Sequence, residues 1–243
     1  MCLKILVTRP DADQKQTIGL LSGLGIEAVS SPVMEAIKLP FMLPDRASEL
    51  PWQAMVVTSR NALRMLESEQ LAQLRSVALY CVGAQTETLA RSLGFDTIGE
   101  TSPDVAHLTD RLLDLFSPDA GPILYLTAKH RSGKLAQALD VDGFDYTLIE
   151  SYEMVALSSL TEEAVAAIQT KRLDGVLLYS SRTSQLLLTL FEKHDLADDM
   201  QHVTFYCLSD AVASPLKPTG YPLVVSAAPN EQSLLACVKK DHN

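Results

Sequence analysis

Basic residues are scarce in this chain of 243 residues, which has 20 lysines and arginines against 30 acidic residues. The formal net charge of −10 argues against a nucleic-acid partner, because such partners usually require a basic surface. Long apolar runs are also missing, since none approaches the roughly 20 residues that a membrane helix needs. The first residues, MCLKILVTRP, lack the basic flank and small-residue cleavage site of a signal peptide. We therefore expect a cytoplasmic protein that binds neither nucleic acid nor membrane.

Cysteine and histidine are few and scattered. The four cysteines show no C-x-x-C spacing and the five histidines no ligand spacing. Cys81 and Cys207 lie in apolar segments, where a free thiol behaves as a small hydrophobic side chain. The phosphate-binding loop, the dinucleotide fingerprint and the G-x-S-x-G motif are missing as well. The chemistry must therefore rest on positioning and acid–base assistance.

Strand and helix patterns alternate throughout, which is typical of α/β proteins with parallel sheets. Two segments, 27–39 and 145–157, are each thirteen residues long, whereas a typical strand has about 5–6. We interpret them as two strands that cross between two compact bodies. The other expected strands are 4–8, 54–59, 77–82, 96–98, 122–126, 175–180, 203–208 and 223–226. The expected helices include 85–93, 105–116, 161–173, 183–194, 210–216 and 229–238, with a short one at 45–50.

The second half of the chain repeats the first. VALYCVGAQTETLARSLGF from Val77 matches VTFYCLSDAVASPLKPTGY from Val203, an offset of 203 − 77 = 126 that also pairs Cys81 with Cys207. MVVTSRNALRML matches LLYSSRTSQLLL, and ILVTRP matches ILYLTA. A generic α/β rhythm is the alternative explanation, but it does not account well for several matches in the same order. The sequence predicts a duplication of two similar α/β units.

Ligands of an open parallel sheet bind beyond the carboxyl ends of its strands. Cations and hydroxyl groups gather at those expected ends, namely Arg9, Ser59, Arg60, Thr86, Lys129, Arg131, Ser180, Arg182 and Ser209. Together with the free N–H groups of helix N-termini, they suit an anionic ligand. The alternatives are that each serine simply caps a helix and that each arginine is solvated.

Tyr152, within the segment 145–157, is the strongest single candidate for catalysis. A phenol can donate a proton or a hydrogen bond to a leaving oxygen. The alternative is that Tyr152 only packs against a neighbouring strand.

Seven stretches carry a resemblance to a known family: ILVTRP at 5–10, VVTSRNAL at 56–63, CVGAQTETLARSLGF at 81–95, LYLTAKHRSGKLAQAL at 124–139, ESYE at 150–153, LLYSSRTS at 177–184 and APNEQSLL at 228–235. Each is a weak motif, but their order and spacing are specific. Through them the chain resembles the uroporphyrinogen-III synthase family over essentially its whole length.

The resemblance implies two similar parallel-sheet α/β domains with helices on both faces, joined by a two-stranded antiparallel β ladder. It places one domain at about 1–36 with 156–243 and the other at about 40–148. The linker strands are then about 27–39 and 145–157. It also implies closure of the linear tetrapyrrole hydroxymethylbilane with loss of water and inversion of the last ring through a spiro intermediate. It implies no metal or organic cofactor.

The resemblance also assigns roles to residues. Tyr152 matches a tyrosine thought to assist departure of the hydroxyl, Thr86 a cleft threonine, and Ser59 and Ser180 serines of two TS-type turns. Ser209 stands where members commonly carry glycine, and Pro229-Asn230 where they carry Pro-Thr, so Asn230 would cap a helix and donate a hydrogen bond. Arg9, Lys129 and Arg131 would set a positive local potential for the eight carboxylates of the substrate, because salt screens distant acids beyond about 8–10 Å.

The expected enzyme is a cyclising hydro-lyase and a monomer, with room for transient contact with hydroxymethylbilane synthase, which supplies the substrate. The alternative is a non-catalytic two-lobed binding module for a small polyanionic ligand. Such a binder would share the repeat and the basic strand ends, but it would not need the phenol of Tyr152 and would show binding without turnover.

Overall fold

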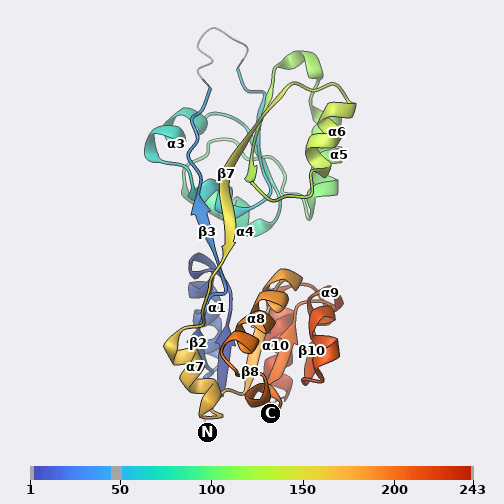
Figure 1. The fold of residues 1–243 in the computed structure, drawn as a ribbon. Coiled ribbons are helices and arrows are strands. Elements are labelled where there is room, and N and C mark those ends of the chain that lie inside the picture. The colour runs from blue at the N-terminus through green and yellow to red at the C-terminus, as the bar shows by residue number, and fades with distance from the viewer. Residues whose placement is uncertain (1–2, 45–50, 242–243) are drawn as a thin grey trace. The chain divides into compact units, whose positions relative to one another are not determined.

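The computed structural model describes residues 3–44 and 51–241, which form two compact units (Figure 1). Unit 1 comprises Met1–Glu35 with Val155–Asn243, and unit 2 comprises Ala36–Met154. Both chain termini therefore belong to unit 1. The short helix expected at 45–50 lies outside the described residues.

Unit 1 contains a five-stranded sheet in the order β10-β9-β8-β1-β2, and all neighbouring strands whose register is defined are parallel. Its strands are β1 (Lys4–Val7), β2 (Glu27–Ser30), β8 (Gly175–Leu178), β9 (Thr204–Cys207) and β10 (Leu223–Val225). Its helices are α1 (Asp11–Gly23), α7 (Glu162–Gln169), α8 (Ser181–Lys193), α9 (Asp210–Ala213) and α10 (Glu231–Asp241). Leu21 of α1 and Leu234 of α10 share a core with Ile5, whereas Phe191 of α8 packs against Phe205, on the opposite face. The sheet is therefore covered by helices on both faces.

The second sheet, in the order β3-β7-β6-β4-β5, belongs to unit 2 except for the first residues of β3 and the last residues of β7, which belong to unit 1. Its strands are β3 (Met34–Lys38), β4 (Ala54–Val57), β5 (Leu79–Cys81), β6 (Ile123–Ala128) and β7 (Tyr146–Ala156), and the helices of unit 2 are α2 (Arg60–Arg64), α3 (Ser68–Leu74), α4 (Ala84–Ser92), α5 (Val105–Leu115) and α6 (Lys134–Val141). Strands β5, β4, β6 and β7 are parallel. One core cluster joins the sheet to α2, α3 and α4, and another joins its opposite face to α5 and α6. The predicted fold class is confirmed.

The two sheets repeat each other as the duplication predicts. Strands β9-β8-β1-β2 of unit 1 correspond to β5-β4-β6-β7 of unit 2. Equivalent hydrogen bonds support the match, since the Ser102 N–H donates to the Cys81 carbonyl at 3.1 Å and the Ser226 N–H to the Cys207 carbonyl at 2.9 Å. Each unit thus combines strands from both halves of the sequence.

The segment 27–39 is not one long strand, as the sequence suggested, but two. Residues 27–30 form β2, which pairs with β1, whereas 34–38 form β3, which lies beside β7 in the other sheet. Pro32 lies at the break and has no N–H to donate to a ladder. The buried Ser31 accepts a hydrogen bond from the Thr161 N–H at 3.0 Å, which fixes the turn.

The ladder of β3 and β7 is antiparallel, as predicted. The Leu39 N–H donates to the Ser151 carbonyl and the Leu157 N–H to the Val33 carbonyl, each at 3.0 Å. The residue numbers give the same sum, 39 + 151 = 33 + 157 = 190, which is the pattern of an antiparallel pair. Figure 1 shows the two strands side by side, β3 in blue and β7 in yellow.

Several predicted bounds were wrong. The strand expected at 96–98 is a single parallel bridge between Ile98 and Leu79, made by the hydrogen bonds of the Leu79 N–H to the Thr97 carbonyl and of the Gly99 N–H to the Leu79 carbonyl. The helix expected at 161–173 ends at Gln169, and Lys171 follows with φ of +52°. The helix expected at 210–216 continues beyond Ala213 as a 3-10 turn over Ser214–Thr219, which contains two prolines.

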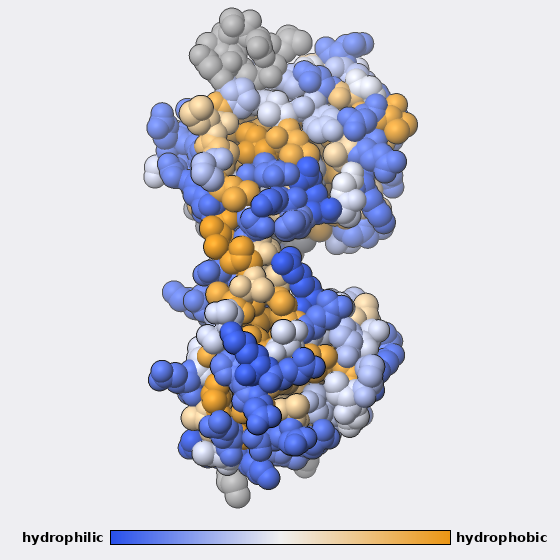
Figure 2. Space-filling model, viewed as in Figure 1, coloured by the Kyte–Doolittle hydropathy of each residue, from blue (hydrophilic) through white to orange (hydrophobic). Residues whose placement is uncertain are grey.

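Hydrophilic residues cover most of the visible face of each unit, with smaller hydrophobic areas between them (Figure 2). This is the usual balance at a protein surface. Within 3–44 and 51–241, no helix is both long and apolar enough to cross a membrane.

Gly175 provides a test of the packing in unit 1. A Cβ atom at Gly175 would lie 2.6 Å from the Tyr206 ring and 2.9 Å from Ile5 Cδ1. Gly175→Ala should therefore destabilise the protein by about 1–3 kcal/mol, as overpacking does elsewhere. The matched control is Gly19→Ala, on the exposed side of α1 with no atom within 4 Å of its Cβ, and it should be neutral or stabilising. Urea unfolding measures both, and equal stabilities would contradict the packing.

Candidate functional site

The five candidate residues of unit 2 lie at one edge of its sheet. Ser59 follows β4, Thr86 lies in the first turn of the helix after β5, and Lys129 and Arg131 follow β6. Because these strands are parallel, their carboxyl ends meet at the same edge. Tyr152 is paired with Ala128, the last residue of β6. The structure thus brings all five to the carboxyl edge of sheet β3-β7-β6-β4-β5.

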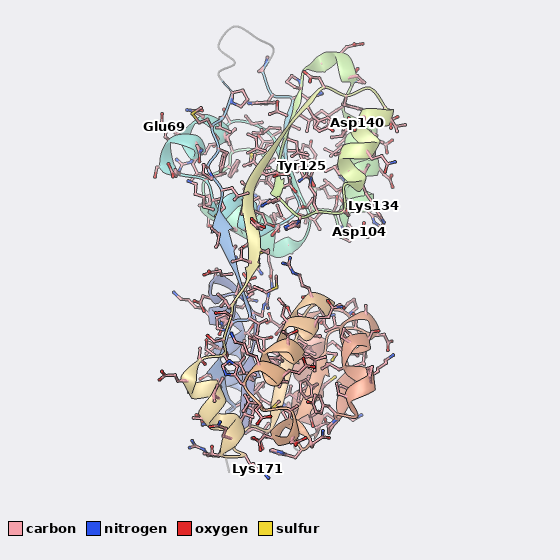
Figure 3. All side chains as sticks on the ribbon, in the orientation of Figure 1. Glu69, Asp104, Tyr125, Lys134, Asp140 and Lys171 are labelled. Carbon is pink, nitrogen blue, oxygen red and sulfur yellow. The ribbon has the colours of Figure 1, made fainter. Side chains whose placement is uncertain are left out.

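Tyr152 is buried, with 5% of its surface exposed, and belongs to the core cluster that includes Ile149. Burial is the main reason why the pKa of Tyr152 lies above its ordinary value. A hydrogen bond with Ser59 opposes this shift, and Tyr125 adds to it. Figure 3 shows Tyr125 in the interior of unit 2, on the strand beside β7. The phenol of Tyr152 therefore stays protonated at neutral pH and can donate a hydrogen bond.

Ser59 and Thr86 lie at helix N-termini. The Ser59 hydroxyl caps α2 by accepting from the Asn61 N–H at 3.2 Å, so the simpler alternative of an N-cap is observed here. Thr86 is 5% exposed and follows Gly83, which precedes α4 with φ of +82°. Such a φ favours glycine and lets the strand turn sharply into the helix. Both helix starts direct partial positive charge toward the same edge.

Lys129 and Arg131, the two cations among the five candidates of this edge, already have carboxylate partners. Lys129 Nζ lies 3.0 Å from Glu153 Oε2, and Arg131 Nη1 lies 2.7 Å from Glu150 Oε1. His130 Nε2 also lies 3.1 Å from Glu153 Oε1. The hydrogen bond and charge of Lys129 lower the pKa of Glu153. Sequence reasoning missed both glutamates, although they flank Tyr152 in the motif ESYE.

Lys129 and Glu150 also line an open pocket of about 530 Å³ whose other walls are Leu39, Pro40, Phe41, Leu148 and Ile149. The pocket is therefore largely apolar, with one cation and one carboxylate. Its volume lies within the range of about 300–1,000 Å³ that is common for small-molecule sites. Over the described ranges, no three His, Cys, Asp or Glu side chains form a group that could hold a metal ion.

The four candidates of unit 1 gather at the carboxyl edge of their own sheet. Ser180 caps α8, accepting from the Thr183 N–H at 3.1 Å. Asn230 Oδ1 caps α10, accepting from the Ser233 N–H at 2.8 Å, as expected for a residue in the family's Pro-Thr position. Ser209 precedes α9, and its hydroxyl makes no capping bond there. The N-termini of three helices thus converge at this edge, which favours an anion.

Arg9 is more enclosed than its place after β1 suggests. Its Nη1 lies 2.9 Å from Glu231 Oε1, and its guanidinium stacks over the Tyr179 ring at 4.2 Å from the centroid. The Glu231 carboxylate also accepts from Thr17 Oγ1 at 2.5 Å and from the Tyr179 hydroxyl at 3.0 Å. Burial, together with the charge of Glu231, raises the pKa of Tyr179 to about 12. The charge of Arg9 is thus balanced inside unit 1, and its contact with a substrate stays a prediction.

A family model described as uroporphyrinogen-III synthase HemD matches residues 15–236. The chain belongs to the uroporphyrinogen-III synthase family. The resemblance seen in the sequence is thereby confirmed, because the match covers 236 − 15 + 1 = 222 of the 243 residues.

Solved structures with the family's name are similar to this chain. A uroporphyrinogen-III synthetase from Helicobacter pylori matches with a TM-score of 0.68 and 18% identity over 100% of both chains. A mutant uroporphyrinogen III synthase from the extremely thermophilic bacterium Thermus thermophilus matches with a TM-score of 0.46 and 15% identity over 98% of each chain. The first of these supports the fold. No curated protein matches the chain.

Proposed function

We propose that this chain closes hydroxymethylbilane to uroporphyrinogen III, with loss of water and inversion of the last pyrrole ring. It would then be a cyclising hydro-lyase of porphyrin synthesis. Beyond family membership, the observation that carries the proposal is the buried, protonated phenol of Tyr152 at an edge with two cations. That combination suits a polyanionic substrate with a hydroxyl leaving group.

The phenol of Tyr152 would donate a hydrogen bond to the terminal hydroxyl of the bilane as its carbon–oxygen bond breaks. The oxygen leaves with the bonding electron pair and becomes water once protonated, and the adjoining pyrrole delocalises the positive charge that remains on carbon. A buried donor that is already in place stabilises the developing charge without reorganisation. Its raised pKa keeps the proton in place between turnovers.

The second task is regiochemical, because attack must occur at the substituted carbon of the last ring to give the spiro intermediate. This is a matter of orientation, which can lower a barrier by several kcal/mol. Lys129 and Arg131, with the helix N-termini beside Ser59 and Thr86, would hold the carboxylates of the substrate at unit 2. Ser180, Ser209 and Asn230 would supply donors at unit 1.

The direct test is to incubate the protein with hydroxymethylbilane generated in situ, oxidise the products and separate the porphyrin isomers. A predominance of isomer III over a no-protein control supports the proposal. Isomer I alone, produced by folded protein, would instead favour a binding module for a polyanion. Saturable binding of the substrate without turnover would point the same way.

Lys129 should contribute to substrate binding more than to chemistry. Lys129→Gln is expected to raise KM about 5–10-fold with kcat nearly unchanged, which corresponds to about 1–1.4 kcal/mol of lost uniform binding. Glu153→Gln should have the opposite effect on KM, because it frees Lys129 from its carboxylate partner. Initial rates across substrate concentration measure both.

The matched control is Lys240→Gln, an exposed lysine in the last turn of α10. It removes the same charge from the whole protein but belongs to unit 1 and is not one of the candidate residues of unit 2. An equal rise in KM in this control would show that net charge, and not the position of Lys129, is responsible.

A further inference from the structure

Strand β7 contains one more residue than its partner β6 at the candidate site. Leu126 pairs with Ile149 and Thr127 with Glu150, but the next residue, Ala128, pairs with Tyr152. Between the pairs Leu126–Ile149 and Ala128–Tyr152, β6 advances by 128 − 126 = 2 residues and β7 by 152 − 149 = 3 residues. Ser151 is therefore the extra residue of a β-bulge. Bulges are rare between parallel strands and are over-represented beside active sites, where they redirect a side chain.

The bulge decides which face of the sheet receives the phenol of Tyr152. Successive side chains of a regular strand alternate, so residues three apart point to opposite faces. Ile149 and Tyr152 are three apart, yet both lie in the same core cluster, together with Leu126 and Ala128. The bulge has thus shifted the alternation by one position. Without it, Tyr152 would point to the face covered by α5 and α6.

The same shift decides which way the carboxylates of β7 point. Glu150 and Glu153 are also three apart, and both reach the short basic segment 129–131. In a regular strand the two glutamates would point to opposite faces, so only one of them could reach the segment 129–131. The bulged pairing therefore presents the phenol in one direction and two carboxylates to the cations in the other.

Ser151 is well held as the bulged residue. It is fully buried, and its carbonyl accepts from the Leu39 N–H at 3.0 Å. Its hydroxyl approaches the Thr127 carbonyl at 3.4 Å, a long contact. After the bulge, the Lys129 N–H donates to the Tyr152 carbonyl at 2.9 Å, which holds the two strands together at their ends. The backbone, more than the side chain, fixes the register.

We propose that the bulge is a positioning device: because Ser151 is left out of the pairing with β6, Tyr152 faces the reaction and not the opposite face of the sheet. The proposal rests on the proposed function only for the role of Tyr152. The placement of the phenol is a separate claim and has its own measurement.

The test is a double-mutant cycle that changes which face of the sheet each side chain of β7 points to. A glycine inserted between Thr127 and Ala128 gives β6 a matching extra residue, so β7 becomes regular and Tyr152 turns away. Exchanging the neighbours, Ser151→Tyr with Tyr152→Ser, misplaces the phenol in the natural register. Each change alone should lower kcat about 50–100-fold, in the range of a lost acid–base group. Together they return a phenol to the original face and should bring kcat within about 10-fold of the natural chain, because the two changes correct each other.

Two changes that merely destabilise the protein would add their effects, so additive losses in a folded, doubly changed chain would overturn the proposal. Circular dichroism and thermal unfolding establish that each variant is folded. If the insertion does not fold, deletion of Ser151 tests the same parity. In the deletion variant, both strands advance by two residues between the pair Leu126–Ile149 and the pair Ala128–Tyr152. Tyr152 then keeps its face, and kcat should stay within about 10-fold of the natural chain. A larger loss in the folded deletion variant would overturn the proposal.

A readout independent of activity separates this inference from the proposed function. The pKa of Tyr152 is raised chiefly by burial, and it can be isolated by comparing phenolate absorbance titrations of each chain with its Tyr152→Phe counterpart. The insertion should lower this pKa toward its ordinary value, because the phenol would then lie on the side of the partly exposed Glu150 and Glu153, near Lys129 and Arg131. An unchanged pKa in the folded insertion variant would contradict the claim that the bulge places the phenol. This outcome does not depend on activity, so it would count even if Tyr152→Phe proved fully active.

Discussion

Tyr152→Phe should lower kcat about 100-fold while KM and the fold stay nearly unchanged. The phenyl ring still fills its place in the core of unit 2, but the variant loses the hydroxyl that contacts Ser59 and that we propose to donate to the leaving oxygen. A 100-fold loss corresponds to about 2.7 kcal/mol of transition-state stabilisation, which is typical of one acid–base group. The measurement is the rate of isomer III formation at saturating substrate.

Tyr146→Phe is the matched control, because it removes a phenol from the same strand. The Tyr146 hydroxyl donates to Asp140 Oδ1 at 3.0 Å, on α6, and Figure 3 shows Asp140 on the outer side of unit 2. This variant should keep the natural rate. A natural rate in Tyr152→Phe as well would remove Tyr152 from the mechanism, and a switch from isomer III to isomer I would show that it orients the substrate instead.

The pH dependence follows from the direction of the pKa shift of Tyr152. Burial raises this pKa above its ordinary value near 10, so the phenol keeps its proton from acidic pH up to at least about pH 10. Ionisation of Tyr152 should therefore cause no loss of kcat between about pH 6 and pH 9. A loss in that range that disappears in Tyr152→Phe would show that the phenol titrates lower than its burial predicts.

The location of the candidate site could be predicted from the sequence because it follows from topology. Alternating strand and helix patterns predict parallel strands, and parallel strands bring their carboxyl ends to one edge. Ser59, Thr86 and Lys129 are far apart in the sequence but each follows a strand, so a rule about strand ends was enough to group them. No side-chain detail was required.

The break within 27–39 could be located less well, although Pro32 marks it. Proline is accepted at strand edges and bulges as well as in loops, so it does not say which sheet each side of the segment joins. That choice depends on partners remote in sequence, β1 for residues 27–30 and β7 for residues 34–38. The bulge at Ser151 escaped prediction for the same reason, because it is defined only by the register with β6.

Ion pairing was the least predictable part of the site. A cation at a strand end suggests an anion site, but its side chain can be matched by an acid from anywhere in the chain. Lys129 is matched by a residue 24 positions away, and Arg9 by Glu231, 222 positions away. The sequence predicted that these cations follow strands, which the structure shows, but it gave no sign that they already have partners.

Arg9→Met should reveal how strongly the network in unit 1 contributes to stability. Only 13% of the Arg9 side chain and 12% of the Glu231 side chain are exposed. Removing the guanidinium leaves the Glu231 carboxylate with three donors, the hydroxyls of Thr17 and Tyr179 and the amide of Gln16, but without its partner charge. Breaking a fully buried pair costs about 3–5 kcal/mol, and these remaining donors should reduce the loss to about 2–3 kcal/mol. Thermal unfolding should show a fall in Tm of about 5–10 °C.

The matched change is Arg9→Met combined with Glu231→Leu, which replaces both charges by apolar side chains of similar size. Because the Glu231 carboxylate is then gone, the double variant should be more stable than Arg9→Met alone, although Asp13, 3.8 Å from the Arg9 guanidinium, keeps its charge in both. Steady-state rates well below the Tm distinguish stability from binding. If Arg9 instead holds a carboxylate of the substrate, Arg9→Met will raise KM with little change in Tm, and the predicted anion-binding role of Arg9 will replace the structural one.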